Sequence, residues 1–266
     1  KFTFARAGSI AGIALLLLVA GCGGQRNTEA ALQSARDAMA RQDYSTATIE
    51  LKNVLQQGER TEAHELLAVS LLELGQFTAA ETHARRALAA GGSQSRLLPV
   101  VAACLQATGH SKRLVDEFGK AAPDDAAARA EFRALLAEAH IALGQPGEAQ
   151  RVLDAARQDQ PDSLRVRVMD ARVLAATGKW EEAAVANNAI LLAKPGYAPA
   201  LALRGDLLVH AGKTGEALSS FASLVEREPR NAQARFAWIT LMMAANDLKA
   251  ASTAIGSMDI DVFYCA

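Results

Sequence analysis

Five glycines recur along the chain at a nearly constant interval. Successive members of the series are separated by about 34 residues: Gly75, Gly109, Gly144, Gly178 and Gly212. Gln42 lies one such interval before the first glycine and Asn246 lies one interval after the last, in the same frame. A period of this length indicates a repeat architecture, in which each unit packs only on its neighbours.

Two further series follow the same period. Five positions after the frame residue stands Leu114 in the third unit and alanine in the others: Ala47, Ala80, Ala149, Ala183, Ala217 and Ala251. Pro161, Pro195 and Pro229 are separated from one another by the same interval. A permissive frame residue ends one helix, a small residue lets two helices approach, and a proline stops the second helix. The unit is therefore predicted to be a helical hairpin.

Composition and charge agree with an all-α protein that does not bind nucleic acid. Half of the residues are apolar, only 5% are aromatic, and no stretch alternates as a β-strand does. The formal net charge is −1, and basic pairs such as Arg85-Arg86 are short and isolated. A nucleic-acid-binding protein usually carries a concentrated basic stripe instead.

The repeat unit resembles the tetratricopeptide repeat. The resemblance is clearest over residues 63–92, at Leu67, Ala68, Leu71, Gly75, Phe77, Ala80 and Ala87. It implies a right-handed superhelical α-solenoid of about seven hairpins over residues 28–265, with repeats starting near residues 28, 61, 95, 130, 164, 198 and 232. The third repeat is irregular, with Pro99 early in its first helix. We expect a bend, or a seam between two sub-arrays, at that point.

The N-terminus has the pattern of a secretory signal over residues 1–21. Lys1 and Arg6 precede a short apolar run, residues 10–20, which is too short to span a bilayer as a helix. The segment Leu18-Val19-Ala20-Gly21-Cys22 resembles the lipobox of bacterial lipoproteins, which implies cleavage before Cys22 and lipidation of that residue. An ordinary signal with an incidental cysteine is the alternative. Residues 22–27 are polar and glycine-rich, and we expect them to form a flexible tether.

The residue after the cysteine bears on localisation. Gly23 stands where an Asp would be the inner-membrane retention signal of some bacteria. We therefore expect an outer-membrane lipoprotein that faces the periplasm of a Gram-negative bacterium.

A more particular resemblance is to the tetratricopeptide-repeat lipoproteins of exosortase/PEP-CTERM systems. It is carried by residues 43–56, 71–81, 86–92 and 115–118. It implies a scaffold in exopolysaccharide export or in protein sorting. Members of that family are usually longer, and residues 259–266 are apolar where a solenoid needs a polar cap, so we expect a C-terminal truncation. The alternatives are service in outer-membrane protein or pilus assembly, and the non-catalytic part of a truncated enzyme.

The resemblance also places a partner-binding groove on the first helix of each hairpin. The groove positions selected as candidate contacts are Glu62, Glu65, Glu73, Arg96, Glu138, Arg165, Arg172, Asp206, His210 and Phe236. Val209 and Met243 fall on the same surface. Alternating charges with apolar anchors are suited to an extended or helical peptide of another protein.

No residue pattern indicates catalysis, a metal or a cofactor. The five histidines form neither an HExxH motif nor a ligand set with cysteine. Gly212-Lys213-Thr214 lacks the upstream glycine of a phosphate-binding loop. Cys104 is predicted to be a small buried hydrophobic residue. We expect no enzyme activity, no cofactor and no small-molecule substrate, only protein partners and a membrane reached through the lipid on Cys22.

Overall fold

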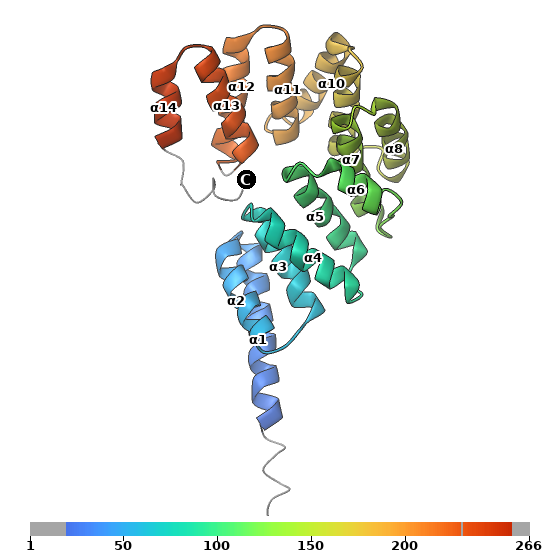
Figure 1. Cartoon of the computed structure of the whole chain (residues 1–266), viewed down its shortest axis with the longest axis vertical. Helices are drawn as coiled ribbons and strands as arrows, with labels where there is room; N and C mark the ends of the chain where they lie inside the picture. Colours follow the sequence, from blue (N-terminus) through green and yellow to red (C-terminus); the bar gives the residue numbers. More distant parts are fainter. Residues whose placement is uncertain (1–19, 230, 257–266) are drawn as a thin grey trace, which may run out of the picture.

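The computed structural model describes residues 20–229 and 231–256, and every regular element in those residues is an α-helix. Figure 1 shows the helices in one curved array. Their bounds are α1 Ala20–Ala40, α2 Tyr44–Gln56, α3 Thr61–Glu73, α4 Phe77–Ala89, α5 Gln94–Ala107, α6 Ser111–Phe118, α7 Ala126–Ala142, α8 Pro146–Asp159, α9 Leu164–Ala176, α10 Trp180–Ala193, α11 Ala198–His210, α12 Thr214–Arg227, α13 Ala232–Ala244 and α14 Leu248–Gly256.

The helices pair consecutively into seven hairpins, each with an odd-numbered first helix and an even-numbered second helix. This confirms the predicted all-α solenoid. From α1 to α11, the first helices of successive repeats contact one another, whereas a second helix contacts its own partner and the first helix of the next repeat. Because the first helices are the more closely spaced row, they line the inner side of the curve seen in Figure 1.

The frame residue of each repeat ends the first helix in the left-handed conformation. The φ angles of the five frame glycines lie between +69° and +80°, and Gln42 and Asn246 adopt +60° and +62°. At Gly75, the following amide of Gln76 donates a 2.8 Å hydrogen bond to the carbonyl of Leu71. Every repeat has the equivalent bond, which satisfies a carbonyl that the helix end would otherwise leave without a partner.

The other two series also have the predicted roles. The recurrent alanines and Leu114 are buried between helices. The prolines stand directly after the caps of α8, α10 and α12 at Gln160, Lys194 and Glu228. Helix α11 lies close to α12 at Gly205, where an added Cβ would be 2.5 Å from the ring of Phe221 on α12.

The third repeat is irregular, as predicted. Helix α5 contains Pro99 and helix α6 has only eight residues. Two large clusters of buried side chains, one over repeats 1–4 and one over repeats 4–7, meet at α7. The hairpin of α7 and α8 is held by Asp159, which accepts a 2.9 Å hydrogen bond from Nε of Arg129 and also pairs with Arg133. Repeat 4 therefore joins the two halves of the core.

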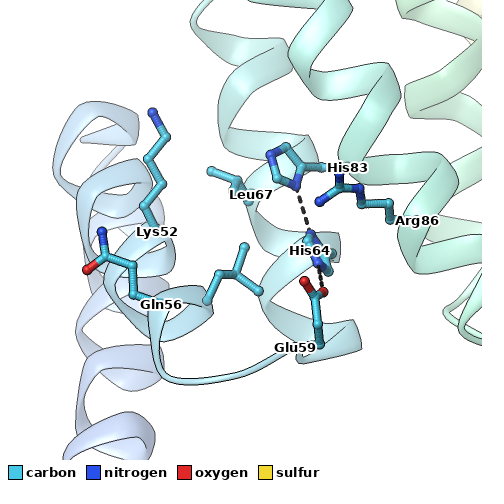
Figure 2. Close-up of a pocket in the computed structure, with 8 residues that line it drawn as sticks. Lys52, Gln56, Glu59, His64, Leu67, His83 and Arg86 are labelled. Carbon is cyan, nitrogen blue, oxygen red and sulfur yellow. Dashed lines mark hydrogen bonds and ion pairs between the residues drawn. The ribbon is translucent and has the colours of Figure 1, made fainter.

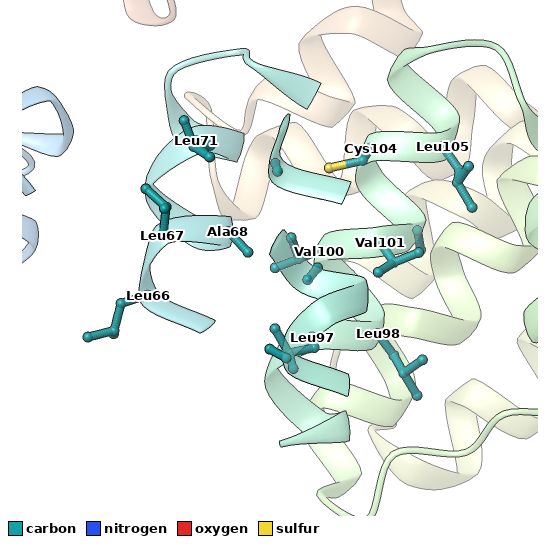
Figure 3. Packing of buried hydrophobic residues seen from close by; sticks show 14 of the residues in the cluster. Leu66, Leu67, Ala68, Leu71, Leu97, Leu98, Val100, Val101, Cys104 and Leu105 are labelled. Atoms are coloured by element: carbon teal, nitrogen blue, oxygen red, sulfur yellow. The ribbon is translucent and has the colours of Figure 1, made fainter. Parts of the chain in front are cut away.

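Figure 3 shows part of the first cluster, where α3 packs against α5. Ala68 of α3 points toward Val100 of α5, and Leu67, Leu71, Val101 and Cys104 belong to the same buried cluster. Burial raises the pKa of the Cys104 thiol to about 12. Because a thiol must ionise to act as a nucleophile or a metal ligand, Cys104 serves as a packing residue, as predicted.

Helix α1 begins at Ala20, and its backbone is helical through residues 22–27, which the sequence assigns to a flexible tether. A helix extends readily from a packed portion because each added residue gains one hydrogen bond. Residues 1–19 of the expected signal and residues 257–265 of the expected array lie outside the described part. None of the described helices has the length and apolarity that a membrane crossing requires.

Candidate partner-binding surface

The ten candidate contacts lie on the first helices, along the inner side of the array. Glu62, Glu65 and Glu73 are on α3, Arg96 on α5, Glu138 on α7, Arg165 and Arg172 on α9, Asp206 and His210 on α11, and Phe236 on α13. Their positions follow from the hairpin period, because the second helix and the neighbouring repeats cover the other faces of each first helix.

In repeats 1–3 the acidic side chains pair with arginines of adjacent repeats. Glu62 forms a 2.6 Å ion pair with Arg36 of α1. Glu65 is buried, accepts a 2.6 Å hydrogen bond from the amide of Ser93, and pairs with Arg96 at 2.7 Å. Glu65 therefore caps the start of α5 and joins repeats 2 and 3. These contacts hold successive first helices in register.

The same arrangement continues in repeats 4–6. Arg165 reaches back to Glu138 of α7 at 3.2 Å. Arg172 reaches forward to Asp206 of α11, where the closest nitrogen and oxygen are 3.9 Å apart. Nε of Arg165 and Nε of Arg172 are buried, and neither has a hydrogen-bond acceptor among the described residues. The pair of Arg172 and Asp206 is thus the more open of the two.

The pKa of the Asp206 carboxyl group reflects the protein that surrounds it. Its side chain is 57% exposed, so water reaches it. Surrounding protein nevertheless raises the pKa of Asp206, because desolvation disfavours the charged form, while the charge of Arg172 lowers it by a smaller amount.

Two further inner positions interact with aromatic side chains of second helices. His210 stacks on Trp180 of α10, with ring centroids 3.6 Å apart and an angle of 17° between the rings. Glu73 is exposed, and its charge contributes to raising the pKa of Tyr44 on α2, after desolvation of that phenol. Sequence reasoning selected His210 but did not anticipate its stacking partner.

Three of the inner positions that remain exposed in the last two repeats are apolar. Val209 is 46% exposed, Phe236 67% and Met243 54%. Val209 and Met243 occupy the same position in successive repeats, and Phe236 lies seven residues before Met243 on the same face of α13. Single exposed apolar residues are ordinary on a protein surface, but three on one concave row are typical of a binding surface.

The described residues contain no group of three or more His, Cys, Asp or Glu side chains arranged to hold a metal ion.

Comparisons with known proteins identify the repeat. Two family models, both described as tetratricopeptide repeat, match the chain: one over residues 115–169 and 141–207, the other over residues 25–95 and 203–255. Together these segments cover more than half of the chain. No protein with a curated description matches it.

Solved structures share the fold at low sequence identity. A tetratricopeptide repeat protein from Parabacteroides merdae superposes with a TM-score of 0.58 and 16% identity, over 89% of this chain and 96% of that protein. Pseudomonas aeruginosa pilF superposes with a TM-score of 0.55 and 18% identity, over 80% of this chain and 96% of pilF. With its seven hairpins and the matched repeat models, the chain belongs to the tetratricopeptide-repeat proteins.

Proposed function

We propose that this protein is a lipid-anchored scaffold that binds a segment of another protein along the inner surface of repeats 5–7. The observation that carries the proposal is the contrast within that surface. Its charged side chains pair with one another across repeats, whereas Val209, Phe236 and Met243 remain exposed. A tetratricopeptide-repeat array is typically a non-catalytic scaffold, and neither matched family is an enzyme family.

The ion pairs indicate which chemistry a partner needs. A ligand charge placed at Glu65 or Arg96 would have to break a 2.7 Å pair. A ligand carboxylate at Arg172 displaces only a 3.9 Å contact and supplies an acceptor to a buried Nε that lacks one. Burying an apolar side chain contributes about 1.5–3 kcal/mol when it becomes fully covered. We therefore infer a peptide with apolar residues next to an acidic one.

The binding test uses matched substitutions on the inner and outer helices. Val209→Asp places a charge on the inner row, and Leu192→Asp places the same charge at a position of α10 that is 84% exposed. In crosslinked pull-downs of the full-length protein from membranes, Val209→Asp and Arg172→Glu should each lose the partner, and Leu192→Asp should keep it. Equal recovery of the partner by all three variants would rule out this surface.

The anchor is proposed from the lipobox-like segment that ends at Cys22. Several acyl chains on one residue hold a protein to a membrane far more firmly than one chain does. Labelling with a palmitate analogue should depend on Cys22, and Cys22→Ala should move the protein out of the membrane fraction. Fractionation of inner and outer membranes tests the proposed outer-membrane location.

The cellular setting is proposed from resemblance. Similarity to exosortase-associated repeat lipoproteins supports a role in exopolysaccharide export or PEP-CTERM protein sorting. The second candidate is outer-membrane protein or pilus assembly. The gene neighbourhood separates them: exosortase and glycan-export genes beside this one support the first role, and pilus or outer-membrane insertion genes support the second.

A further inference from the structure

A second polar cluster lies away from the inner surface, in a solvent-open cleft of about 310 Å³ formed by α2, α3 and α4 (Figure 2). His64 of α3 is buried at its base, and His83 comes from α4. Lys52 and Gln56 stand on α2, across the cleft from His83 and Arg86. Sequence reasoning missed this cluster, since His64 and His83 lie on different helices and meet only through the hairpin.

A chain of hydrogen bonds orients the two imidazoles. Nδ1 of His64 and Nδ1 of His83 are 2.7 Å apart, and Nε2 of His64 is 2.6 Å from Oε2 of Glu59. The carboxylate only accepts, so Nε2 of His64 carries a proton, and one further proton lies between the two Nδ1 atoms. The rings stack with centroids 4.9 Å apart. Both Nδ1 atoms are therefore occupied, and Nε2 is the ring nitrogen of His83 left for another contact.

Positively charged side chains outnumber negatively charged ones around the cleft. Glu59 is the one carboxylate that lines it, and Glu59 is bonded to His64. Lys52 and Arg86 line the same cleft and form no ion pair within the described residues, although many other arginines of the array do. A divalent metal is poorly suited to this surrounding, because two cations repel it and the convergent ring nitrogens already bond each other.

We propose that this cleft binds a dianionic group of the phosphate or sulfate type, held by Lys52, Arg86 and Nε2–H of His83. The ligand supplies the negative charge that the two cations lack, and tetrahedral oxygens accept from both walls of the cleft at once. The bond to Glu59 keeps His64, and through it His83, in position. This site lies on repeats 1 and 2 and is independent of the partner-binding surface on repeats 5–7.

Binding at this site is coupled to a proton. The charged groups that face His83 are His64 from α3, Lys52 from α2, Arg86 from α4 and Glu59 from the loop after α2. Burial, followed by the charges of His64, Arg86 and Lys52, lowers the pKa of His83 below its ordinary value of 6.5. A bound dianion reverses part of that repulsion, so binding should raise the pKa of His83 and strengthen as the pH falls.

Sulfate is the probe of choice because it stays dianionic across the range in which histidine titrates. The full chain is titrated with sulfate at low ionic strength, and the histidine ring resonances are followed by NMR. We expect His83 and His64 to shift with saturation, while His110, exposed before α6, stays unchanged. Affinity should be several-fold higher near pH 6 than near pH 8. No saturable shift of His83, or an affinity independent of pH, would overturn the proposal.

Substitutions assign the contacts. Arg86→Gln and Lys52→Gln should each weaken sulfate binding by about fivefold. Arg204→Gln removes the same charge at an exposed position of α11 and should leave binding unchanged. These are exposed positions, and circular dichroism checks that each variant is folded. If Arg204→Gln weakened sulfate binding as much as Arg86→Gln does, sulfate would be attracted by the overall charge of the protein and the specific site would be refuted.

The dianionic group has two possible sources, a free ion and a phospholipid headgroup. Vesicles of phosphatidylcholine alone are compared with vesicles that also contain a phosphomonoester lipid, phosphatidic acid. If the ligand is a headgroup, vesicles that contain phosphatidic acid should recruit the unsubstituted chain more strongly than they recruit the Arg86→Gln variant. If the ligand is a free ion, these vesicles should recruit the unsubstituted chain and the Arg86→Gln variant equally, and sulfate should still shift the His83 resonances with saturation. Zn²⁺ binding to both imidazoles with no response to sulfate would contradict both forms of the proposal.

Discussion

Alanine substitutions at two nearby glycines should have opposite effects on the free energy of unfolding, because only one of the two glycines adopts the left-handed conformation. Gly144 ends α7 with φ +69°, whereas Gly147 lies in the first turn of α8 outside the left-handed region. A Cβ added at either position meets no atom within 4 Å. Replacement of each by alanine therefore isolates the backbone conformation from packing.

The expected magnitudes follow from the backbone alone. The left-handed conformation costs an L-residue about 1–2 kcal/mol. Alanine recovers about 0.4–1 kcal/mol of that by restricting the unfolded chain. Gly144→Ala should then lower the free energy of unfolding by about 1 kcal/mol. Gly147→Ala should raise it by about 0.5–1 kcal/mol, because alanine is the better helix former.

The converse substitution, to glycine, can be made at Gln42, because Gln42 adopts φ +60° at the same frame position. Gln42→Gly should raise the free energy of unfolding by about 0.5 kcal/mol, the relief of strain less the added entropy of the unfolded chain. Urea unfolding followed by circular dichroism measures all three variants, with midpoints compared at equal slope. If Gly144→Ala and Gly147→Ala changed stability in the same direction, the turn would not be the constraint on this repeat.

The remaining predictions concern packing, charge, pH and thiol reactivity. Gly205→Ala forces Phe221 to move and should cost about 1–3 kcal/mol in urea unfolding. Asp159→Asn leaves two arginines without their shared carboxylate and should cost about 1–3 kcal/mol in the same assay, with an Asp124→Asn control near zero. Because the pKa of His83 is lowered in the fold, the unfolded chain takes up that proton first, so stability should fall as the pH drops below 6.5, and His83→Gln should flatten that part of the pH profile. Cys104 should resist alkylation near pH 8 until urea is added, as read by mass spectrometry of its peptide.

The fold was predictable because its constraints recur. A residue that ends a helix must repeat wherever the hairpin repeats, so the glycine series alone placed the turns, and the frame extended correctly to Gln42 and Asn246. Pro99 likewise marked the irregular repeat, since a proline within a helix removes a backbone hydrogen bond. The helical backbone of residues 22–27 was not foreseen, because glycine-rich composition was weighed without the packed helix that follows.

The contents of the inner surface were less predictable. The period identifies which positions face inward, but whether a charge there is paired depends on how far one repeat is displaced along the next. Glu65 and Arg96, on successive first helices, meet at 2.7 Å, while Arg172 and Asp206, also on successive first helices, remain at 3.9 Å. The two pairs are 31 and 34 residues apart in the sequence and run in opposite charge order, and opposite charge alone does not tell which pair closes. The contact between His64 and His83 depends in the same way on rotamers that no period encodes.

Site-specific photo-crosslinking in cells tests directly whether a partner segment lies on the inner row of repeats 5–7. A photoreactive amino acid replaces Val209 on the inner row or, in the matched control, Leu192 on the second helix α10. We predict a discrete crosslinked partner from position 209, abolished by Arg172→Glu, and none from position 192. A partner captured from position 192 and not from position 209 would contradict it.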